Sequence, residues 1–149
     1  MLSGLRRTVI QMVLKILLTG AKGTLGKYLL PEIQWWRPSA KITTNERWQC
    51  DLSNWDKVNV KYGGTEYDII VHCAAYTNVA YSNLQHGQVL KDNIYASVNM
   101  IRLAEKSKAK LVFISTDFVF DGKVGQYSPE DKINPQTVYA KSKASTELA

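Results

Sequence analysis

The chain is poor in cysteine, in proline and in long apolar runs. Its 149 residues include 2 Cys and 4 Pro, too few cysteines for a disulfide scaffold. Cys50 and Cys73 lie far apart without a CxxC spacing, so we expect reduced thiols and a cytoplasmic protein. No stretch reaches the roughly 18 consecutive apolar residues of a membrane span, so we expect no membrane partner. With 45% hydrophobic and 21% charged residues, the sequence is typical of one globular domain rather than of a disordered or collagen-like chain.

Acidic residues are absent before Glu32, and Met12 offers a second start just before the first strong apolar run. We therefore expect residues 1–12 to be an N-terminal extension and residues 13–149 to form one domain. A gene start placed too far upstream is our preferred interpretation, and a transit peptide is the alternative.

Positive charge exceeds negative charge in this sequence. Lysine and arginine outnumber aspartate and glutamate by 19 to 13, which gives a net charge of +6. This balance suits an anionic partner such as a nucleotide or a nucleic acid. Because the basic residues are scattered along the chain, we expect no nucleic-acid partner.

Predicted strands and helices alternate along the chain. Apolar runs predict strands at 13–19, 40–44, 48–51, 68–74 and 110–115. Helices are predicted at 23–34, where Pro31 should shorten or kink the helix, at 54–62 with Asn54 as its cap, and from about 138. A further helix is predicted from the spacing of Leu90, Ile94, Val98, Ile101 and Ala104.

This alternation predicts the α/β class, with a Rossmann-type doubly wound parallel sheet that is incomplete on its C-terminal side. Ligands of such sheets bind at the carboxyl ends of the strands. The chemistry should therefore lie near Gly20, Thr44, Ala74 and Thr116.

Three glycines join the first predicted strand to the first predicted helix. Gly20 allows a tight turn, Gly23 lets the backbone approach a pyrophosphate, and Gly26 lets the helix and the strand pack closely. The helix N-terminus adds oriented N–H groups and partial positive charge. The loop, which includes Lys22, Thr24 and Leu25, is therefore predicted to hold a dinucleotide.

The residues after the second predicted strand leave the choice of dinucleotide open. Glu46 lies 20 residues after Gly26 and could bond the adenosine ribose of NAD(H), whereas the neighbouring Arg47 could hold the 2′-phosphate of NADP(H). A surface charge is the alternative for both residues. We expect NADP(H) or NAD(H), with NADP(H) slightly favoured, and we expect no metal.

Tyr139 and Lys143 are four residues apart in the last predicted helix and therefore share one of its faces. The spacing alone is weak, because about 0.75 such pairs are expected by chance, but the pair follows the strand that ends at Thr116. A free tyrosine has a pKa of about 10, and a neighbouring ammonium stabilises its phenolate for proton transfer. We expect Tyr139 to donate a proton to a ketone oxygen that Thr116 orients, and Lys143 to assist Tyr139 and bond the nicotinamide ribose.

Five segments in this order resemble the extended short-chain dehydrogenase/reductase family: TGAKGTLG at 19–26, DLS at 51–53, HCAAYTNV at 72–79, STDFVFDG at 115–122 and YAKSK at 139–143. Within that family STDFVFDG looks like the dTDP-4-dehydrorhamnose reductase branch, whose usual form has Tyr in place of Phe118. The acidic positions that often follow AAYT are also replaced here, since Val79 is followed by Ala80, Tyr81, Ser82 and Asn83.

The resemblance implies roles for individual residues. The catalytic residues would be Thr116, Tyr139 and Lys143. The cofactor would be bound by Gly20, Lys22, Gly23, Thr24, Leu25, Gly26, Arg47, Asp51, Leu52, Ala74, Ala75, Thr77, Tyr139 and Lys143. Asp51 by itself would sooner be interpreted as a turn or helix-capping residue.

The resemblance also implies a nucleotide-sugar substrate and, if the chain self-associates, a homodimer. Members of the family are much longer than this chain, so we expect the substrate domain to be absent and part of the sheet to be uncovered. Three interpretations remain: the cofactor-binding portion of a nucleotide-linked 4-keto sugar reductase, a non-catalytic module similar to the regulatory subunit of methionine adenosyltransferase, and an inactive truncated remnant.

Overall fold

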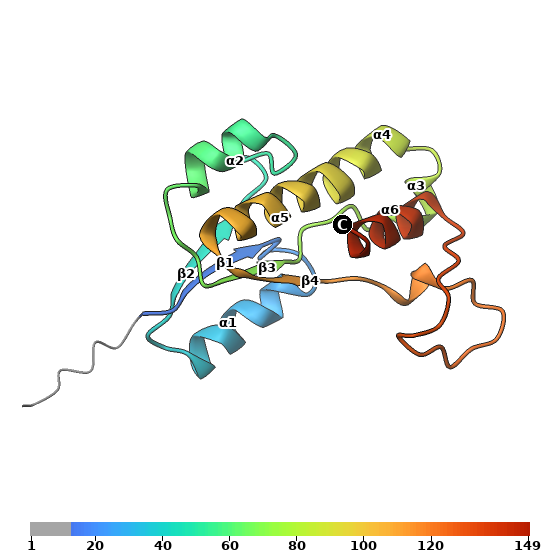
Figure 1. The fold of residues 1–149 in the computed structure, drawn as a ribbon, viewed down its shortest axis with the longest axis horizontal. Helices are drawn as coiled ribbons and strands as arrows, with labels where there is room; N and C mark the ends of the chain where they lie inside the picture. Colours follow the sequence, from blue (N-terminus) through green and yellow to red (C-terminus); the bar gives the residue numbers. More distant parts are fainter. Residues whose placement is uncertain (1–12) are drawn as a thin grey trace, which may run out of the picture.

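Four parallel strands form the centre of the protein in the computed structural model, which describes residues 13–149 (Figure 1). The strands are β1 (Lys15–Thr19), β2 (Lys41–Asn45), β3 (Ile69–His72) and β4 (Lys110–Phe113), and their order in the sheet is β2-β1-β3-β4. All neighbouring strands run parallel. The predicted parallel sheet of the α/β class is therefore confirmed, while the expected N-terminal extension lies outside the described residues.

Apolar residues of β1 place this strand in the middle of the sheet. Leu17 and Leu18 are fully buried, and Ile16 pairs with Ile42 of β2 on one side and with Ile69 of β3 on the other. Because the chain moves from β1 to β2 in one direction and to β3 in the other, the strand order reverses at β1. A crevice opens at the carboxyl ends of strands at such a reversal.

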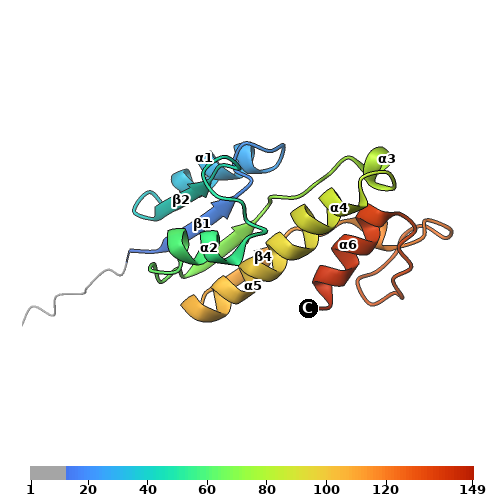
Figure 2. The same ribbon diagram turned by 90° about the horizontal axis from the view of Figure 1, so that it is seen from above.

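Helices cover both faces of the sheet (Figures 1 and 2). Helix α1 (Gly26–Trp36) lies on one face, and α2 (Trp55–Tyr62) and α5 (Ala96–Ser107) lie on the other. Buried side chains of α2, α5 and the strands form the main apolar core, which includes Leu17, Val58, Ile70, Met100 and Leu103. As predicted, the Asn54 side chain caps α2 by accepting a hydrogen bond from the N–H of Lys57.

A long helical stretch precedes and includes α5. After the short helix α3 (Val79–Ser82), helix α4 (His86–Val89) continues into a π-helical turn (Leu90–Tyr95) and then into α5. The last helix, α6 (Val138–Glu147), packs beside the π-helical turn (Figure 2). Between β4 and α6 the chain forms a 3₁₀ helix (Asp117–Val119) and a long loop.

Some sequence predictions were wrong in detail. Residues 48–51, predicted as a strand, form turns instead, because the N–H groups of Gln49 and Cys50 bond back to the carbonyl of Glu46. Pro31 does not shorten α1, which continues to Trp36. Proline lacks an N–H, so α1 has one hydrogen-bond donor fewer at this position but continues for five residues beyond it.

The apolar residues that predicted α5 are not its most buried ones. Leu90 is 41% exposed and Val98 is 37% exposed, whereas Asn93 and Ser97 are almost completely buried. The buried face of the helix is therefore partly polar, because its side chains bond groups on neighbouring elements. Of the apolar residues that predicted the helix, Ala104 is buried in the core together with Met100 and Leu103, whereas Leu90 and Val98 lie closer to solvent.

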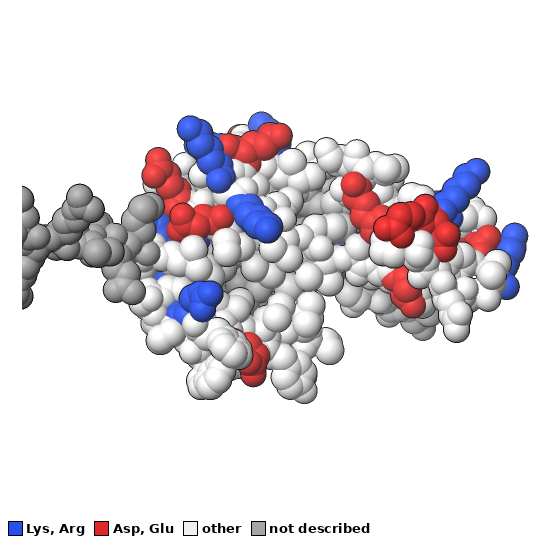
Figure 3. All heavy atoms as spheres, turned by 60° about the horizontal axis from the view of Figure 1, so that its bottom comes forward, with Lys and Arg blue, Asp and Glu red and all other residues white. Residues whose placement is uncertain are grey.

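Charges are unevenly distributed over the surface that Figure 3 shows. Acidic side chains gather at the end of the molecule that holds the loop between β4 and α6. This loop contains Asp117, Asp121, Glu130 and Asp131. Within residues 13–149, no helix combines the length and the apolar character that crossing a bilayer requires.

Candidate functional site

A pocket of about 450 Å³ opens at the carboxyl ends of the strands. A pocket of this size lies within the range of small-molecule and cofactor sites. The lining comes from the glycine loop, from the segment after β2, from the segment after β3, from the helical stretch that leads into α5, and from the end of β4 and α6. Of the predicted site residues, those that line it are Gly20, Gly23, Thr24, Leu25, Gly26, Arg47, Asp51, Leu52, Ala74, Ala75, Thr77, Tyr139 and Lys143.

Two glycines of the loop are required by the local geometry. Gly20 has φ +69°, and a Cβ there would lie 2.6 Å from the backbone nitrogen of Ala74. A Cβ on Gly26 would lie 2.2 Å from the carbonyl oxygen of Gly20. Neither position accommodates a side chain, so β1, β3 and α1 approach each other closely at the mouth of the pocket.

The N-terminus of α1 faces this loop without a side-chain cap. Leu25 occupies the capping position, and the first turn holds no acidic residue. The first N–H groups of a helix have no partner inside the helix, and its N-terminus carries partial positive charge. With Gly23 beside it on the pocket wall, this end of the pocket has the cradle and the donors that a pyrophosphate needs.

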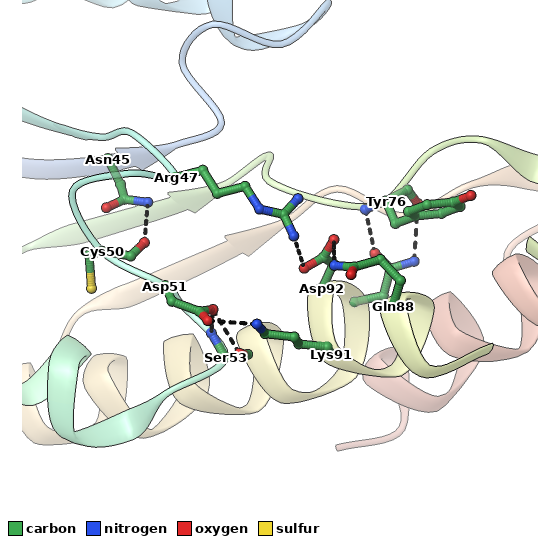
Figure 4. Close-up of polar contacts among 10 residues, drawn as sticks. Asn45, Arg47, Cys50, Asp51, Ser53, Tyr76, Gln88, Lys91 and Asp92 are labelled. Atoms are coloured by element: carbon green, nitrogen blue, oxygen red, sulfur yellow. Dashed lines mark hydrogen bonds and ion pairs between the residues drawn. The ribbon is translucent and has the colours of Figure 1, made fainter. Parts of the chain in front are cut away.

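The turn after β2 brings Arg47, and not Glu46, to the pocket. Glu46 forms an ion pair with Lys22 at 3.2 Å, and neither residue lines the pocket. Arg47 extends across to the π-helical turn, where its guanidinium donates a hydrogen bond of 2.9 Å to Asp92 (Figure 4). The binding role predicted for Lys22 stays a prediction that this arrangement does not favour.

Asp51 combines a structural role with a place on the pocket wall. Its carboxylate accepts hydrogen bonds from the N–H and the hydroxyl of Ser53, which forms a local turn, and it pairs with Lys91 at 2.8 Å. Burial alone raises the pKa of Asp51, but the hydrogen bonds from Lys91 and Ser53 and the charge of Lys91 outweigh it and lower this pKa to about 2. A negative charge therefore stays at this end of the pocket at neutral pH.

Lys143 and Tyr139 bring ionisable groups to the other end of the pocket. Lys143 is only 4% exposed, and its ammonium lies 3.9 Å from the centre of the Phe113 ring. Burial lowers the pKa of Lys143 to about 8, although the nearby Glu147 and Cys73 act in the opposite direction. Among residues 13–149 no hydrogen bond or ion pair is formed by this ammonium, which leaves its donors to the pocket.

Thr116 is placed differently from the other two predicted catalytic residues. Its hydroxyl accepts a hydrogen bond from the N–H of Phe118 and contacts the Asp117 carboxylate, so it caps the 3₁₀ helix. Thr116 does not line the pocket, whereas its neighbour Ser115 does. The catalytic role of Thr116 stays a prediction, and it requires the hydroxyl to turn away from this cap.

Sequence reasoning missed a buried polar network that positions the pocket walls. The Asn93 amide bonds the backbone N–H and carbonyl of Tyr76 and the hydroxyl of Ser142, and it thereby links the segment after β3 to α6. A signal for this role exists in the sequence, since Asn93 and Ser97 are polar residues one turn apart in a helix that must bury a face.

His72 forms a second buried link. Its Nδ1 lies 2.6 Å from the Thr19 hydroxyl, and its Nε2 lies 3.1 Å from the Ser97 hydroxyl. The Thr19 hydroxyl also accepts a hydrogen bond from the N–H of Ala74 at 3.3 Å. Burial, with the charge of Lys143, lowers the pKa of His72 to about 3. The neutral ring therefore connects β1, β3 and α5 below the pocket.

A second hollow of about 530 Å³ lies in the loop after β4. Its lining includes Phe118, Phe120 and Tyr127, of which the latter two rings stack at 4.6 Å. Phe118 also meets the ring of Tyr139 edge-on at 6.4 Å. The two hollows are thus neighbours on either side of the Phe118–Tyr139 contact. In the described part of the chain, no cluster of three or more His, Cys, Asp or Glu side chains is arranged to hold a metal ion.

Comparison with known proteins assigns the family. The sequence model of the family described as "RmlD substrate binding domain" matches residues 14–149. The chain belongs to this RmlD family. The resemblance seen in the motifs is thereby confirmed.

The curated relatives of the chain include reductases and a subunit of methionine adenosyltransferase. The chain is 30% identical over 141 residues to a dTDP-4-dehydrorhamnose reductase of Mycobacterium tuberculosis, covering 91% of this chain and 45% of the relative. It is 31% identical over 140 residues to methionine adenosyltransferase 2 subunit beta of Rattus norvegicus, covering 91% and 42%. The chain therefore spans a little under half the length of the curated relatives it matches.

Solved structures support the same fold. A dTDP-4-dehydrorhamnose reductase of Clostridium acetobutylicum matches with a TM-score of 0.85 and 30% identity, covering 91% of this chain and 48% of that one. The reductase of Bacillus anthracis, solved in complex with NADP, matches with a TM-score of 0.82 and 30% identity, covering 92% and 48%. The RmlD-type Rossmann sheet is thus shown for this chain.

Proposed function

We propose that the chain is the cofactor-binding portion of an NAD(P)H-dependent reductase that acts on a nucleotide-linked 4-keto sugar. The observation that carries this proposal is a single pocket with a glycine cradle and an uncapped helix N-terminus at one end and Tyr139 and Lys143 at the other. Relatives with the name dTDP-4-dehydrorhamnose reductase support the substrate class. On this proposal residues 13–149 form the dinucleotide-binding domain.

NADP(H) is the favoured cofactor. Arg47 lines the pocket and supplies a guanidinium where a 2′-phosphate would lie, whereas the carboxylate of Glu46 pairs with Lys22 outside it. The related reductase of Bacillus anthracis was solved with NADP. Bound NADPH would supply the hydride for the carbonyl carbon.

The residues of the chain would supply the proton and its control. Tyr139 would donate the phenolic proton to the carbonyl oxygen, so that the ketone becomes an alcohol. The Lys143 ammonium would bond the nicotinamide ribose and stabilise the phenolate that remains, and Thr116 would orient the substrate oxygen. Phe118 and the aromatic hollow beside Tyr139 would accommodate the sugar side of the substrate.

Substitution of the phenol tests the reductase proposal. The full chain is mixed with NADPH and dTDP-4-dehydrorhamnose, and NADPH oxidation is followed by absorbance. Tyr139→Phe should lower the rate about 10²- to 10⁴-fold while NADPH binding changes by less than about threefold. Tyr28→Phe, which changes a phenol that is 65% exposed on α1, is the matched control and should keep the rate. NADPH binding without turnover, when the chain is joined to the C-terminal half of a related reductase, would contradict the reductase proposal.

A non-catalytic dinucleotide-binding module is the second candidate. The identity of 31% to methionine adenosyltransferase 2 subunit beta supports it, although the related reductases, with solved structures among them, support the first candidate more strongly. The local engagement of the Thr116 hydroxyl by the 3₁₀ helix also favours a binding role over turnover. This candidate predicts tight NADP(H) binding that Tyr139→Phe leaves unchanged and no oxidation of NADPH with the keto sugar.

We also propose that the chain forms a homodimer through the outer face of the helical stretch that includes α5. Leu90 and Val98 are 41% and 37% exposed there, and apolar side chains along one helix suit a self-complementary contact. Light scattering should give twice the chain mass of 16.8 kDa. Val98→Glu should give the monomer, and a monomer from the unchanged chain would contradict this proposal.

A further inference from the structure

An ion pair crosses the adenosine end of the pocket. Arg47 comes from the turn after β2 and Asp92 from the π-helical turn, and Nη2 of Arg47 lies 2.9 Å from Oδ1 of Asp92 (Figure 4). Both residues line the pocket. The pair therefore connects two walls of the pocket instead of lying along one of them.

The side chains of Asp92 and Arg47 differ in how firmly other residues hold them. The Asp92 side chain is 13% exposed, and its Oδ2 accepts a hydrogen bond of 2.6 Å from the amide of Gln88 one turn earlier in the helix. The Arg47 side chain is 73% exposed and forms its side-chain hydrogen bond to Asp92 alone among the described residues. Asp92 is thus fixed by the helix, and Arg47 is the partner that can move to a ligand.

A second pair beside it keeps the two walls together. Lys91 and Asp51 form an ion pair at 2.8 Å, one residue away from Asp92 along the π-helical turn (Figure 4). The turn after β2 is thus linked to the helix even when Arg47 leaves Asp92. Exchange of the Arg47 partner therefore does not require the pocket wall to detach.

We infer that Asp92 sets the cofactor preference of this site by competing with the 2′-phosphate of NADP(H) for the guanidinium of Arg47. This inference rests on the proposed dinucleotide function. A dinucleotide with a 2′-phosphate takes Arg47 from Asp92, and the freed carboxylate stays on Gln88 near the incoming anion. A dinucleotide without that phosphate binds while the Arg47–Asp92 pair remains.

The binding of NADPH therefore has two unfavourable free-energy contributions that the binding of NADH lacks. The first is the loss of a partly exposed ion pair, and the second is the repulsion between the Asp92 carboxylate and a phosphate held by the same arginine. Asp92→Asn removes both costs while keeping the size of the side chain and an oxygen that can accept from Gln88. The affinity for NADPH relative to NADH should then rise about fivefold to thirtyfold.

The experiment measures the dissociation constants of NADPH and NADH by calorimetry on the full chain. For Asp92→Asn, NADPH should bind more tightly while NADH stays within about twofold. The fragments 2′,5′-ADP and 5′-ADP should show the same change in their ratio, which assigns the effect to the adenosine end. Glu32→Gln removes one negative charge from the exposed surface of α1 and, as the matched control, should leave both constants unchanged.

A double-mutant cycle separates competition from a general change in structure. Arg47→Met should abolish the preference for NADPH, and adding Asp92→Asn to it should change the ratio less than Asp92→Asn does when Arg47 is present, because only the repulsion by the carboxylate is then left to remove. A loosened pocket wall would instead alter both affinities together. Equal changes for NADH and NADPH, a shift toward NADH, or a full effect without Arg47 would each overturn the role of Asp92 while the dinucleotide function stands. Failure of the unchanged chain to bind either dinucleotide would overturn both proposals.

Discussion

The buried ammonium of Lys143 should make the protein less stable than it would be with an uncharged side chain. Lys143 is 4% exposed, and burial lowers its pKa from 10.5 to about 8. Since a tenfold change in a protonation equilibrium is worth about 1.4 kcal/mol, holding this charge in the folded state costs about 3 kcal/mol at neutral pH. Lys143→Met keeps the length of the side chain and its contact with Phe113 and removes this cost.

We therefore expect Lys143→Met to raise the free energy of unfolding at pH 7 by up to about 3 kcal/mol. The difference should narrow as the pH rises. Above about pH 8 the folded protein releases the lysine proton while the unfolded chain keeps it to about 10.5, so the unfolded state binds more protons and the unchanged protein gains stability. At pH 10 the difference should be about 1 kcal/mol.

Urea denaturation followed by circular dichroism at pH 7, 8, 9 and 10 measures this difference. Lys141→Met is the matched control, because Lys141 is exposed on the same helix, and it should change stability by less than about 0.5 kcal/mol. The reasoning is refuted if Lys143→Met destabilises the protein at pH 7, or if its effect does not depend on pH. A stabilising loss of a pocket lysine is the pattern expected of a residue kept for binding or catalysis.

Three further predictions concern the scaffold of the site. Gly20→Ala should lower the free energy of unfolding in urea by more than about 2 kcal/mol, because residue 20 has positive φ and its Cβ would meet the backbone of Ala74. Gly64→Ala is the control and should cost less than about 1 kcal/mol, because the space around Gly64 is open. Equal costs would contradict the close approach of Gly20 to Ala74. Burial holds the pKa of His72 near 3, while the unfolded chain protonates this residue near 6.5, so the free energy of unfolding should fall by up to about 1.4 kcal/mol for each unit by which the pH is lowered between these values. His72→Asn should lack this part of the pH dependence. An unchanged pH dependence would show that the ring titrates in the folded state. Asn93→Ala should cost about 1–3 kcal/mol in thermal or urea unfolding, since it leaves the partly buried N–H of Tyr76 without its acceptor and takes a donor away from the buried hydroxyl of Ser142. A neutral effect would mean that water replaces the amide.

The order of the elements could be predicted from sequence because local signals agree with the fold. The continuous apolar runs became β1, β3 and β4, and Asn54 caps α2 as its residue type suggests. Residues 48–51 were misjudged because apolar and aromatic side chains there suggested a strand. The hydrogen bonds of the turn around Glu46 decided otherwise, and no periodicity reports them.

The candidate site also contains some features that the sequence alone specifies and others that it does not. The glycine loop has a fixed place between a strand and a helix, so its position in the pocket followed from the motif alone. The contact of Arg47 with Asp92 joins residues 45 positions apart, and it depends on how a turn is placed against a helix. The local cap that Thr116 forms also depends on a loop conformation that side-chain types do not specify.

Two neighbouring residues of the π-helical turn Leu90–Tyr95 contact two different elements. Asp92 reaches Arg47 across the pocket, and the next residue, Asn93, reaches Ser142 of α6. A π-helical turn is equivalent to one residue inserted into an ordinary α-helix. Deletion of one residue here would produce a regular helix, but it would rotate everything before the turn by about 100° relative to α5. Both partners would then be lost at once, so the irregular turn keeps the cofactor wall and the Tyr139 helix in register.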